Sequence, residues 1–378
     1  MTGAMVDPAA VYVDVTSLSQ TKLTGVGRCV ARVVQALAAI RPIRLFSMAR
    51  LEDLRDHGQK TGIHQGLEIE LAPGCLPPDG CDMHDWRDSV FSMPSRPFDH
   101  RSSVEAVGIY TFRRSVKKRF AREVSIHFDL TACVVPHTHE SQTRQEFSLL
   151  VEQMIPLDDG LMAISKSTRD DLVWLGGADS RKVDWCHLGP SQCLAAHAWK
   201  GELPRRDPDL FLAVSTIEPR KNPAMLLEWF LTSPVLPERA RLVWAGPSGW
   251  MVDRGKIPGS RNRRTIDFLG MISDSELCRL HSSARCLVYP SIYEGFGFPV
   301  LDSLLHGTPV ICSGNSSLLE FAGPGVHFAD PFDFASLDAA WMALRESEWP
   351  VERADLQASC SWPRFAGKLL ELTRGGRP

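Results

Sequence analysis

The sequence predicts an α/β protein made of two Rossmann-like domains, each built on a parallel sheet. Three observations lead to this prediction. The chain of 378 residues is longer than a single hydrophobic core usually serves. Its second half alternates short apolar runs with segments of helical periodicity, which is typical of a parallel sheet covered by helices on both faces. The first half opens with the same pattern of strand, helix and strand.

The N-terminal domain is expected to cover residues 1–200. Residues 50–105 are rich in Pro, Gly and Asp and show weak periodicity, which indicates irregular or inserted structure. The expected elements of this domain are a strand at 11–15, a helix at 30–40, a strand at 43–46, a helix at about 109–122, a helix at 147–154 and a strand at 160–165.

The C-terminal domain is expected to occupy residues 201–355, after a polar, proline-bearing linker at 201–209. Ser273 with Glu276, and Ser317 with Glu320, have the spacing of a capping box at a helix start. The expected strands are 211–214, 241–245, 266–269, 286–289, 310–312 and 326–328, and the expected helices are about 223–231, 274–284, 299–306, 317–322 and 335–346.

The composition excludes several classes of protein. With 44% hydrophobic and 23% charged residues the chain has the balance of a globular protein, and a net charge of −3 argues against a nucleic-acid partner. No apolar run approaches the roughly 18–20 residues of a membrane span, and the N-terminus lacks a secretory signal pattern, so we expect a cytoplasmic protein. Ten cysteines without C-x-x-C pairs indicate free thiols.

The most informative stretch reads YPSIYEGFGFPVLD and covers residues 289–302. An apolar run comes to an end there, Gly295 and Gly297 follow, and Pro299 stands where a helix typically begins. A strand, a glycine turn and a helix start bring backbone N–H groups together at the positive end of a helix, which suits an anionic ligand. Glu294 enters this turn.

This stretch, with an acid at position 302 and Gly-Thr-Pro-Val at 307–310, resembles the donor-site block of the family 4 retaining glycosyltransferases, members of glycosyl transferases group 1. The family pattern has glutamate at both acidic positions, whereas this sequence has Asp302 at the second. The resemblance covers residues 205–345 strongly. It implies the GT-B fold, two Rossmann-like domains facing across a cleft, and a final segment, 356–378, that returns as a helix to the N-terminal domain.

The resemblance also implies a function. It implies a retaining, metal-independent transfer of mannose or a similar hexose from a nucleotide sugar to a glycan or lipid-linked acceptor, in bacterial-type polysaccharide or glycoconjugate synthesis. No cofactor is implied, and GDP-mannose is favoured as donor over UDP- and dTDP-sugars. Two other functions stay open: a catalytically silent GT-B-fold binding protein, which Asp302 and Ser215 favour, and another GT-B enzyme such as a phosphorylase or an epimerase.

A second segment carries the charges that such a reaction needs. Breaking a sugar–nucleotide bond leaves negative charge on a diphosphate, which fixed cations and N–H donors must neutralise. The segment STIEPRKN at 215–222 follows the first strand of the second domain. In it Arg220 offers a planar fork and Lys221 a compact charge, the two usual ways to hold phosphate. It resembles the family's diphosphate loop, although many members carry an arginine where Ser215 stands.

By the same resemblance, Glu294 is expected to act at the donor sugar as a catalytic residue, and Asp302 is expected to bind the nucleotide ribose. The turn Thr24-Gly-Val-Gly-Arg28 resembles the N-terminal glycine loop of the family. The remaining expected donor-binding residues are the glycines and phenylalanines of these two turns, namely Gly25, Gly27, Gly295, Phe296, Gly297 and Phe298.

His127-Phe-Asp-Leu130 resembles the family's active-site His-Asp pair with one inserted residue, which makes His127 the second expected catalytic residue. His137 and His139 remain alternatives, and so does a structural role for His127 in the core. Asp207-Pro-Asp209 spells the metal-binding D-x-D of another glycosyltransferase fold. It lies in the linker without a strand end beside it, so no metal is expected.

Six cations fall on ten residues of the helix expected at about 109–122: Arg113, Arg114, Lys117, Lys118, Arg119 and Arg122. Phe112, Val116 and Phe120 would form an apolar stripe on such a helix. A basic helix with an apolar face can lie on an anionic membrane, so contact of 112–122 with the inner membrane face is one interpretation. The other is a helix whose apolar face packs in the core.

Overall fold

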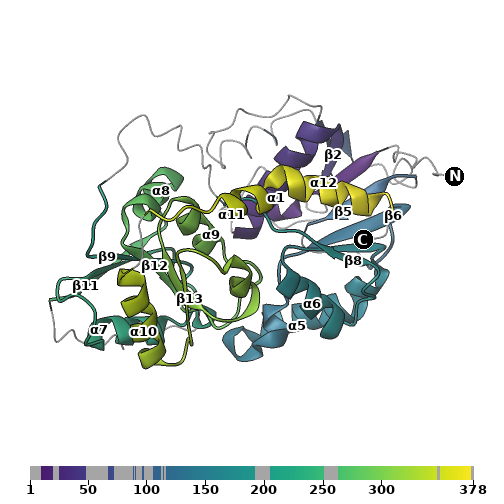
Figure 1. Cartoon of the computed structure of the whole chain (residues 1–378). Coiled ribbons are helices and arrows are strands. Elements are labelled where there is room, and N and C mark those ends of the chain that lie inside the picture. Colours follow the sequence, from purple (N-terminus) through teal and green to yellow (C-terminus); the bar gives the residue numbers. More distant parts are fainter. Residues whose placement is uncertain are drawn as a thin grey trace. The chain divides into compact units, whose positions relative to one another are not determined.

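The structure is a computed structural model of the chain. It describes residues 10–19, 25–47, 67–71, 88, 90, 96–97, 105–111, 114, 116–191, 205–250, 263–346 and 350–375. Thr24, Phe112, Arg113, residues 201–204 and most of 50–105 therefore lie outside the described residues. The chain divides into two compact units (Figure 1). Unit 1 comprises Met1–Leu130, Gln145–Ser191 and Cys360–Pro378, and unit 2 comprises Thr131–Arg144 and Gln192–Ser359.

Unit 1 is built on an eight-stranded sheet with the strand order β4-β3-β2-β1-β5-β6-β7-β8. The six strands from β2 to β8 in this order pair in parallel, whereas β3 and β4 are added antiparallel at one edge. The strands are β1 Val11–Asp14, β2 Ile43–Ser47, β3 Leu67–Leu71, β4 Arg96–Pro97, β5 Val107–Tyr110, β6 Arg122–His127, β7 Gly160–Ala163 and β8 Val183–Trp185.

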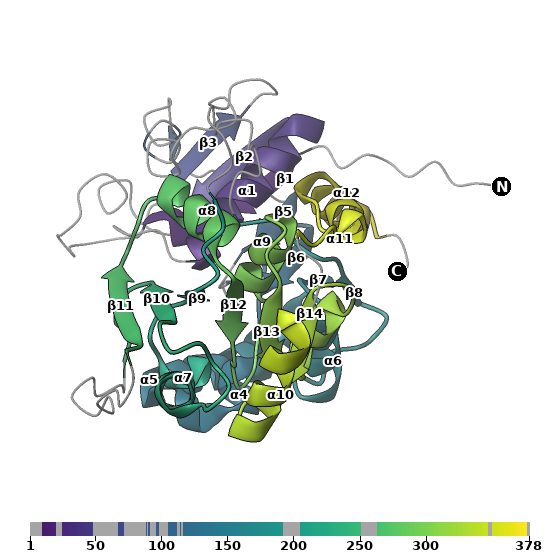
Figure 2. The same cartoon turned by 60° about the vertical axis from the view of Figure 1, so that its left-hand side comes forward.

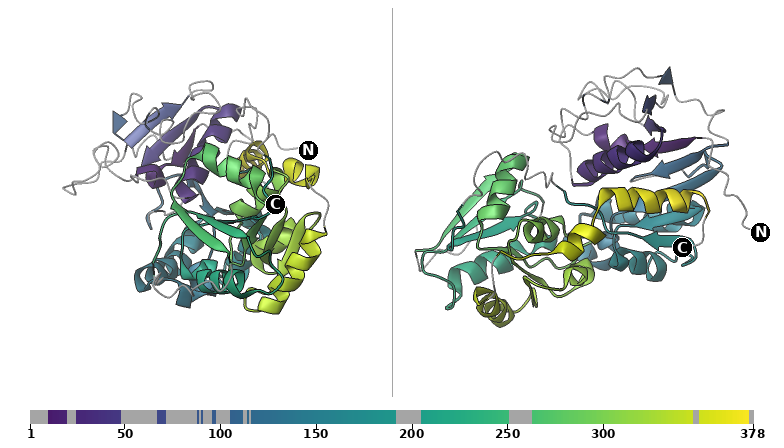
Figure 3. Two further views of the ribbon diagram at one scale, coloured as in Figure 1. Left: turned by 90° about the vertical axis from the view of Figure 1, so that its left-hand side faces the viewer. Right: turned by 45° about the horizontal axis from the view of Figure 1, so that its top comes forward.

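The helices before β9 include one long amphipathic helix, α1, which buries an apolar face that includes Val30, Val33 and Leu37. The C-terminal helix α12 packs on α1 and on β6 and β7, as the right-hand view of Figure 3 shows. The helices and helical turns are η1 Thr16–Ser19, α1 Gly25–Ile40, α4 Thr131–Val134, η2 Pro136–Thr138, α5 Ser141–Leu149, a π-helical turn η3 Leu150–Met154, η4 Ile155–Leu157, α6 Lys166–Trp174 and, at the C-terminus, α12 Trp362–Thr373.

The prediction of a helix at about 109–122 is wrong. β5 ends at Tyr110, β6 begins at Arg122, and the described residues between them are not helical. Phe120 is buried, with its ring 5.2 Å from the ring of Tyr12 and 5.2 Å from that of Phe46. The aromatic spacing that matches one face of a helix therefore comes from a loop that places Phe120 in the core.

The basic residues of this loop are divided between the interior and the surface. Arg114 is buried and forms ion pairs with Glu123 and Asp158. Lys117 and Lys118 are exposed, and Lys118 pairs with Asp159 at the surface. The cations therefore do not share one solvated helical face.

Unit 2 is built on a six-stranded parallel sheet with the order β11-β10-β9-β12-β13-β14, which can be followed across Figure 2. All six strands expected in this half are confirmed. They are β9 Leu210–Val214, β10 Arg241–Ala245, β11 Thr265–Gly270, β12 Cys286–Tyr289, β13 Val310–Ser313 and β14 Val326–Ala329. The helices and helical turns are η6 Pro219–Lys221, α7 Pro223–Thr232, α8 Asp274–Ser283, α9 Phe298–Leu305, η8 Ser316–Phe321, α10 Phe334–Arg345 and α11 Ala354–Ser359.

Large aromatic residues from α7, α10 and the strands fill the core of unit 2. Trp229 and Phe230 on α7 are fully buried, and Phe211 on β9 lies 4.9 Å from the ring of Trp341 on α10. Burying such a side chain stabilises the fold by about 1.5–3 kcal/mol. This core holds β9 and β12 in the middle of the sheet, and their carboxyl ends are where ligands bind in parallel sheets.

The two expected capping boxes have different outcomes. The N-cap of the first is confirmed, because Ser273 Oγ accepts the backbone N–H of Glu276 at 3.2 Å. The second is wrong: η8 has Asn315 at its N-cap position without a side-chain capping bond. Ser317 instead donates to the carbonyls of Glu294 and Phe296. Its hydroxyl is used to hold the glycine turn after β12.

Candidate active site

The turn between β12 and α9 takes its shape from one glycine. Gly297 has φ +107°, and a Cβ there would lie 2.6 Å from Leu318 Cδ2, so both backbone conformation and space require glycine. α9 begins at the next residue, with Pro299 in its first turn as the sequence predicts. The positive end of α9 thus lies at the carboxyl end of β12.

Polar side chains after β13 hold this turn. Ser316 Oγ accepts the N–H of Glu294 at 3.1 Å, and Ser317 Oγ donates to Glu294 O at 2.9 Å and Phe296 O at 2.8 Å. Asn315 donates to the carbonyl of Ile292 at 2.9 Å. Sequence reasoning missed this role of the three residues; the cluster of small polar residues directly after a buried strand was the available signal.

The loop after β9 brings the cations to the same place. Gly246, with φ +142°, lets the backbone after β10 approach so closely that a Cβ would lie 1.9 Å from the carbonyl oxygen of Ser215. Asn222 ends the loop in the left-handed conformation, and its amide donates to Pro331 O at 2.6 Å. The N–H of Ile292 donates to Arg220 O at 2.8 Å, which joins the two loops.

Glu294 lies between the two cations. Its Oε2 accepts a hydrogen bond from Arg220 Nη1 at 2.7 Å, and its Oε1 accepts one from Lys221 Nζ at 2.5 Å. All three side chains are less than 15% exposed. The structure therefore brings the expected catalytic acid and both expected phosphate ligands into direct contact.

Two further residues complete this cluster, and sequence reasoning did not single out either. Glu218 accepts a hydrogen bond from Arg220 Nη2 at 2.7 Å, and the Tyr289 hydroxyl accepts one from Lys221 Nζ at 2.8 Å. Two cations thus face two carboxylates. An ammonium has three N–H donors, and Lys221 uses two of them here, which leaves one for a ligand.

Burial and charge compete in setting the pKa values of the cluster. Burial alone would raise the pKa of Glu294, but Arg220 and Lys221 outweigh it and lower that pKa to about 2. Burial, with Arg220 beside it, lowers the pKa of Lys221, while Glu294 opposes the shift. Burial raises the pKa of Glu218 against the pull of the same cations. Glu294 is therefore a carboxylate at any physiological pH.

The other expected donor ligands of unit 2 lie around this cluster. Gly295 and Phe296 belong to the turn, and the Phe296 ring packs against those of Phe298 and Phe321 at 5.1 and 5.4 Å. Asp302 is buried on α9, in the fifth position of the helix. Its contact with a ribose stays a prediction.

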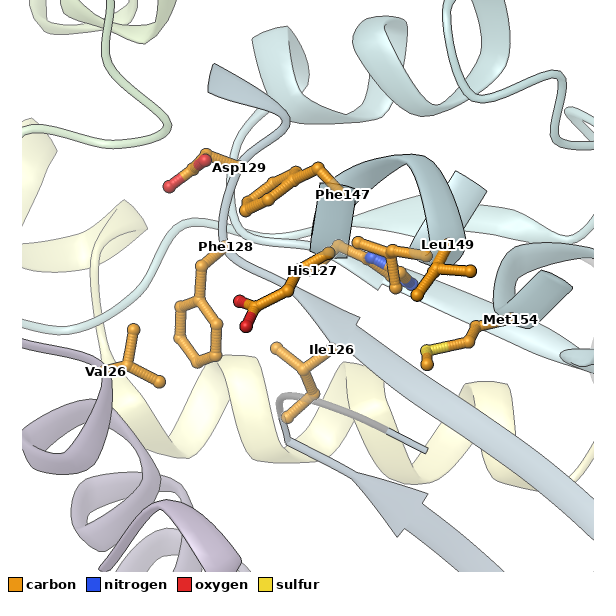
Figure 4. Close-up of a pocket in the computed structure, with 10 residues that line it drawn as sticks. Val26, Ile126, His127, Phe128, Asp129, Phe147, Leu149 and Met154 are labelled. Atoms are coloured by element: carbon orange, nitrogen blue, oxygen red, sulfur yellow. The ribbon is translucent and has the colours of Figure 1, made fainter. Parts of the chain in front are cut away.

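Unit 1 has a pocket of its own at the carboxyl end of β6, with about 710 Å³ of space that includes open solvent. His127, Phe128 and Asp129 line it together with Glu146 and Phe147 of α5. In Figure 4 the His127 ring lies toward Leu149, whereas Phe128 points toward Val26. The remaining lining residues are Ile126, Leu150 and Met154.

The glycine turn expected before α1 is not a separate turn. Gly25 and Gly27 form the first turn of α1 itself, and Val26 between them lines the pocket beside His127. The sequence pattern therefore located the right end of α1 but not its conformation. Donor binding by the two glycines stays a prediction.

Of the three candidate histidines, His127 is the one that lines this pocket. It is 4% exposed, and its Nε2 lies 3.9 Å from Asp158 Oδ2. His137 is exposed in η2, and His139 is nearly buried with its ring 6.3 Å from that of Trp250. Both belong to the segment that groups with unit 2. The geometry favours His127 as the active-site histidine.

The D-x-D sequence forms a local turn. Asp207 accepts the N–H of Asp209 at 3.0 Å through one oxygen and the guanidinium of Arg241 at 3.1 Å through the other. In the part of the chain that the structure describes, no group of three or more His, Cys, Asp or Glu side chains is arranged to hold a metal ion. Metal independence stays a prediction.

Known glycosyltransferases are similar to this chain in sequence. Residues 197–355, which include both loops of the charge cluster, match the family model described as "Glycosyl transferases group 1". This part of the chain belongs to this glycosyltransferase family. The glycosyltransferase is 26% identical to O-antigen chain mannosyltransferase B of Escherichia coli over 369 residues, which cover 86% of this chain and 88% of the relative. It is 40% identical to O-antigen chain mannosyltransferase RfbU of Salmonella typhimurium over 204 residues, 51% of this chain and 53% of the relative.

Solved structures share the GT-B fold of this glycosyltransferase. The complex of HepE from Anabaena with UDP and glucose has a TM-score of 0.56 at 14% identity and covers 96% of this chain and 94% of its own. WaaG, a glycosyltransferase of lipopolysaccharide biosynthesis, has a TM-score of 0.53 at 14% identity and covers 97% of this chain and 98% of its own. These likenesses show the GT-B fold.

Proposed function

We propose that this glycosyltransferase moves mannose, with retention and without a metal ion, from GDP-mannose to a glycan or lipid-linked acceptor in bacterial-type polysaccharide synthesis. One observation carries the proposal: Arg220, Lys221 and Glu294 form a buried, hydrogen-bonded cluster beside the positive end of α9. A diphosphate leaving group is stabilised by such fixed cations and a helix start. The mannosyltransferase relatives support mannose as the sugar.

In this proposal each member of the cluster has a separate task. Lys221 and Arg220 bind the phosphates and neutralise the charge that develops as the glycosidic bond breaks. Glu294, an anion held by both cations, faces the hydroxyls and the positive charge of the donor sugar. Because the cluster is already hydrogen-bonded, little reorganisation is needed when the substrate binds.

A panel of donors tests this function. Ligands that bind the folded protein raise its melting temperature by mass action, so GDP-mannose is expected to raise it more than UDP-glucose or dTDP-glucose at equal concentration. GDP-mannose should also be hydrolysed slowly without an acceptor. A larger shift with a UDP- or dTDP-sugar would identify that nucleotide sugar as the donor in place of GDP-mannose. No shift with any donor would favour a silent binding protein.

The cellular place of the enzyme is part of the proposal. Among the helices of the described residues, none combines the length and apolar character that a membrane crossing needs. The amino ends of β6, β7 and β8 share one edge of the sheet, where Val116 is 53% exposed and Trp174 is 82% exposed. Lys117 and Lys118 are exposed on the same edge. Aromatic and basic side chains together favour the interface of an anionic membrane, and we infer peripheral contact with the cytoplasmic face.

Vesicle sedimentation tests this contact. The wild type is expected to sediment with anionic vesicles at low salt, and the pair of changes Lys117→Gln and Lys118→Gln should release it while donor hydrolysis continues. A wild type that stays in the supernatant would remove membrane contact from the proposal and leave the transfer reaction untouched.

A further inference from the structure

A second buried charge network lies in unit 1, apart from the donor cluster. Arg114 Nη1 donates to Asp158 Oδ1 at 2.5 Å, and its Nη2 donates to Glu123. The side chains of all three residues are no more than 1% exposed. A buried charge requires partners, and Arg114 with its two carboxylates satisfies this requirement inside the fold.

The network runs along one face of β6 toward the pocket. Side chains alternate between the faces of a strand, so Glu123, Ser125 and His127 lie on the same face of β6. Arg114 reaches Glu123, and Asp158 reaches Ser125, whose Oγ donates to Asp158 Oδ1 at 2.7 Å. The next residue on this face is His127, which lines the pocket.

Two buried polar atoms meet at the end of this row without hydrogen-bond partners. They are Asp158 Oδ2 and His127 Nε2, which face each other at 3.9 Å. Leaving such buried polar groups without a hydrogen bond destabilises the folded protein. A closure of about 1 Å would give them a charge-assisted hydrogen bond of ordinary length.

We propose that Asp158 is a positioning residue that fixes the tautomer of His127 by accepting the Nε2 proton. Nδ1 then carries the lone pair and is the ring nitrogen available to the pocket, where it accepts a hydrogen bond from a sugar hydroxyl. The hydroxyl rests on the proposed function, whereas the tautomer does not.

The position of Asp158 is fixed from several sides. Its backbone N–H donates to Ile155 O at 3.2 Å, and its carbonyl accepts from Lys182 Nζ at 2.9 Å. Its Oδ1 is held by Arg114 and Ser125, so only Oδ2 is left for His127. An imidazole oriented by a carboxylate in this way keeps one tautomer and one ring orientation.

Two other carboxylates line the pocket and are the alternatives. Asp129 follows β6 and Glu146 lies on α5, and both line the same pocket as His127. A carboxylate on the pocket side would take the Nδ1 proton instead and give the opposite tautomer. The two arrangements therefore differ in which ring nitrogen is protonated.

Imidazole ¹⁵N shifts of histidine-labelled protein at neutral pH distinguish them. The His127 signals are assigned among 12 histidines by their loss in His127→Gln. We expect protonated Nε2 and unprotonated Nδ1 in the wild type. Asp158→Asn should change this pattern, whereas Glu123→Gln, which neutralises the other buried carboxylate of the network, should keep it.

Turnover gives the second readout. Asp158→Asn should lower kcat by about tenfold or more while the donor KM stays nearly constant, as expected when an imidazole loses the group that orients it. Protonated Nδ1 in the wild type would overturn the proposal, as would equal effects of Asp158→Asn and Glu123→Gln on the His127 signals. A wild type with the expected tautomer but no transfer activity keeps the pairing and removes the proposed function instead.

Discussion

At the scale of single residues, Glu294 is the centre of the donor site because two cations hold one carboxylate. Without Arg220 and Lys221 its burial would favour the neutral acid, and with them its pKa falls to about 2. The sequence motif identified this glutamate, but not the cations as its partners, because residues 220–221 and 294 are brought together only by the sheet. The site is therefore a tertiary feature built from two local motifs.

Glu294→Gln tests the division of tasks within the cluster. Turnover should fall by about a hundredfold or more, because the charge facing the donor sugar is lost at nearly constant volume. The affinity for GDP should stay equal or rise, because Arg220 and Lys221 are no longer neutralised by this carboxylate. Steady-state kinetics and calorimetric titration with GDP measure the two effects. Weaker GDP binding with normal turnover would contradict both roles.

The same variant has a defined pH dependence of stability. The folded pKa of Glu294, about 2, lies below the ordinary glutamate value of 4.5. Its contribution to stability is therefore present above about pH 4.5 and is lost as the pH falls toward 2. Urea unfolding should show the wild type more stable than Glu294→Gln at pH 7, with the gap closing below pH 4.5. A gap that does not change with pH would show that the carboxylate is not held as an anion.

Asp14, at the carboxyl end of β1, has a pKa that is shifted in the opposite direction from that of Glu294. Burial raises its pKa to about 6, although Thr16 donates to its Oδ1 through the backbone N–H at 3.1 Å and the hydroxyl at 2.6 Å. For a carboxyl with a raised folded pKa, the stability is present below the unfolded pKa of 3.8 and is lost as the pH rises through about 6.

Asp14→Asn should therefore stabilise the protein at pH 8, by roughly 1–2 kcal/mol, and the gain should shrink as the pH is lowered toward 4. The amide keeps an oxygen for Thr16 and adds no charge. Urea unfolding at the two pH values measures the difference. A variant that is less stable than the wild type at pH 8 would show that the fold stabilises the Asp14 carboxylate, which contradicts the raised pKa.

At the scale of elements, the turn between β12 and α9 depends on Gly297. Gly297→Ala should cost about 1–3 kcal/mol, because alanine rarely adopts φ +107° and its Cβ would meet Leu318. Gly367→Ala in α12 is the matched control: no heavy atom lies within 4 Å of its Cβ, so it should stabilise by about 0.5–1 kcal/mol. Thermal unfolding compares the two. Equal stability of both variants would show that the turn tolerates a side chain.

The strands of unit 2 could be predicted because buried parallel strands read as continuous apolar runs. Val288 and Leu287 on β12 are examples, since both are fully buried. The loop before β6 could not be predicted, because Phe120 repeats the spacing of a helix face while its contacts, Tyr12 and Phe46, are distant in sequence. The capping role predicted for Ser317 is wrong for a similar reason. Its hydroxyl donates to a carbonyl of the turn after β12, which is distant in sequence, and not to its own helix start.

At the scale of the whole molecule, transfer is expected to need no divalent ion, because the phosphates are met by Arg220, Lys221 and the start of α9. Turnover should survive excess EDTA, and Asp207→Asn should match the wild type because Asp207 holds a local turn at Asp209 and pairs with Arg241 near the surface. Both are measured in the transfer assay with GDP-mannose. Loss of activity with EDTA and recovery with manganese would contradict this expectation.

The central claim, that the charge cluster of unit 2 binds the diphosphate of the donor, is tested most directly by calorimetric titration with GDP in the presence of EDTA. The wild type is compared with Lys221→Met and with Lys368→Met, which removes a cation that pairs with Asp184 in unit 1. We expect Lys221→Met to weaken GDP binding at least about tenfold, the effect of one charged hydrogen bond, and Lys368→Met to bind like the wild type. GDP binding that is unchanged in Lys221→Met would contradict the account.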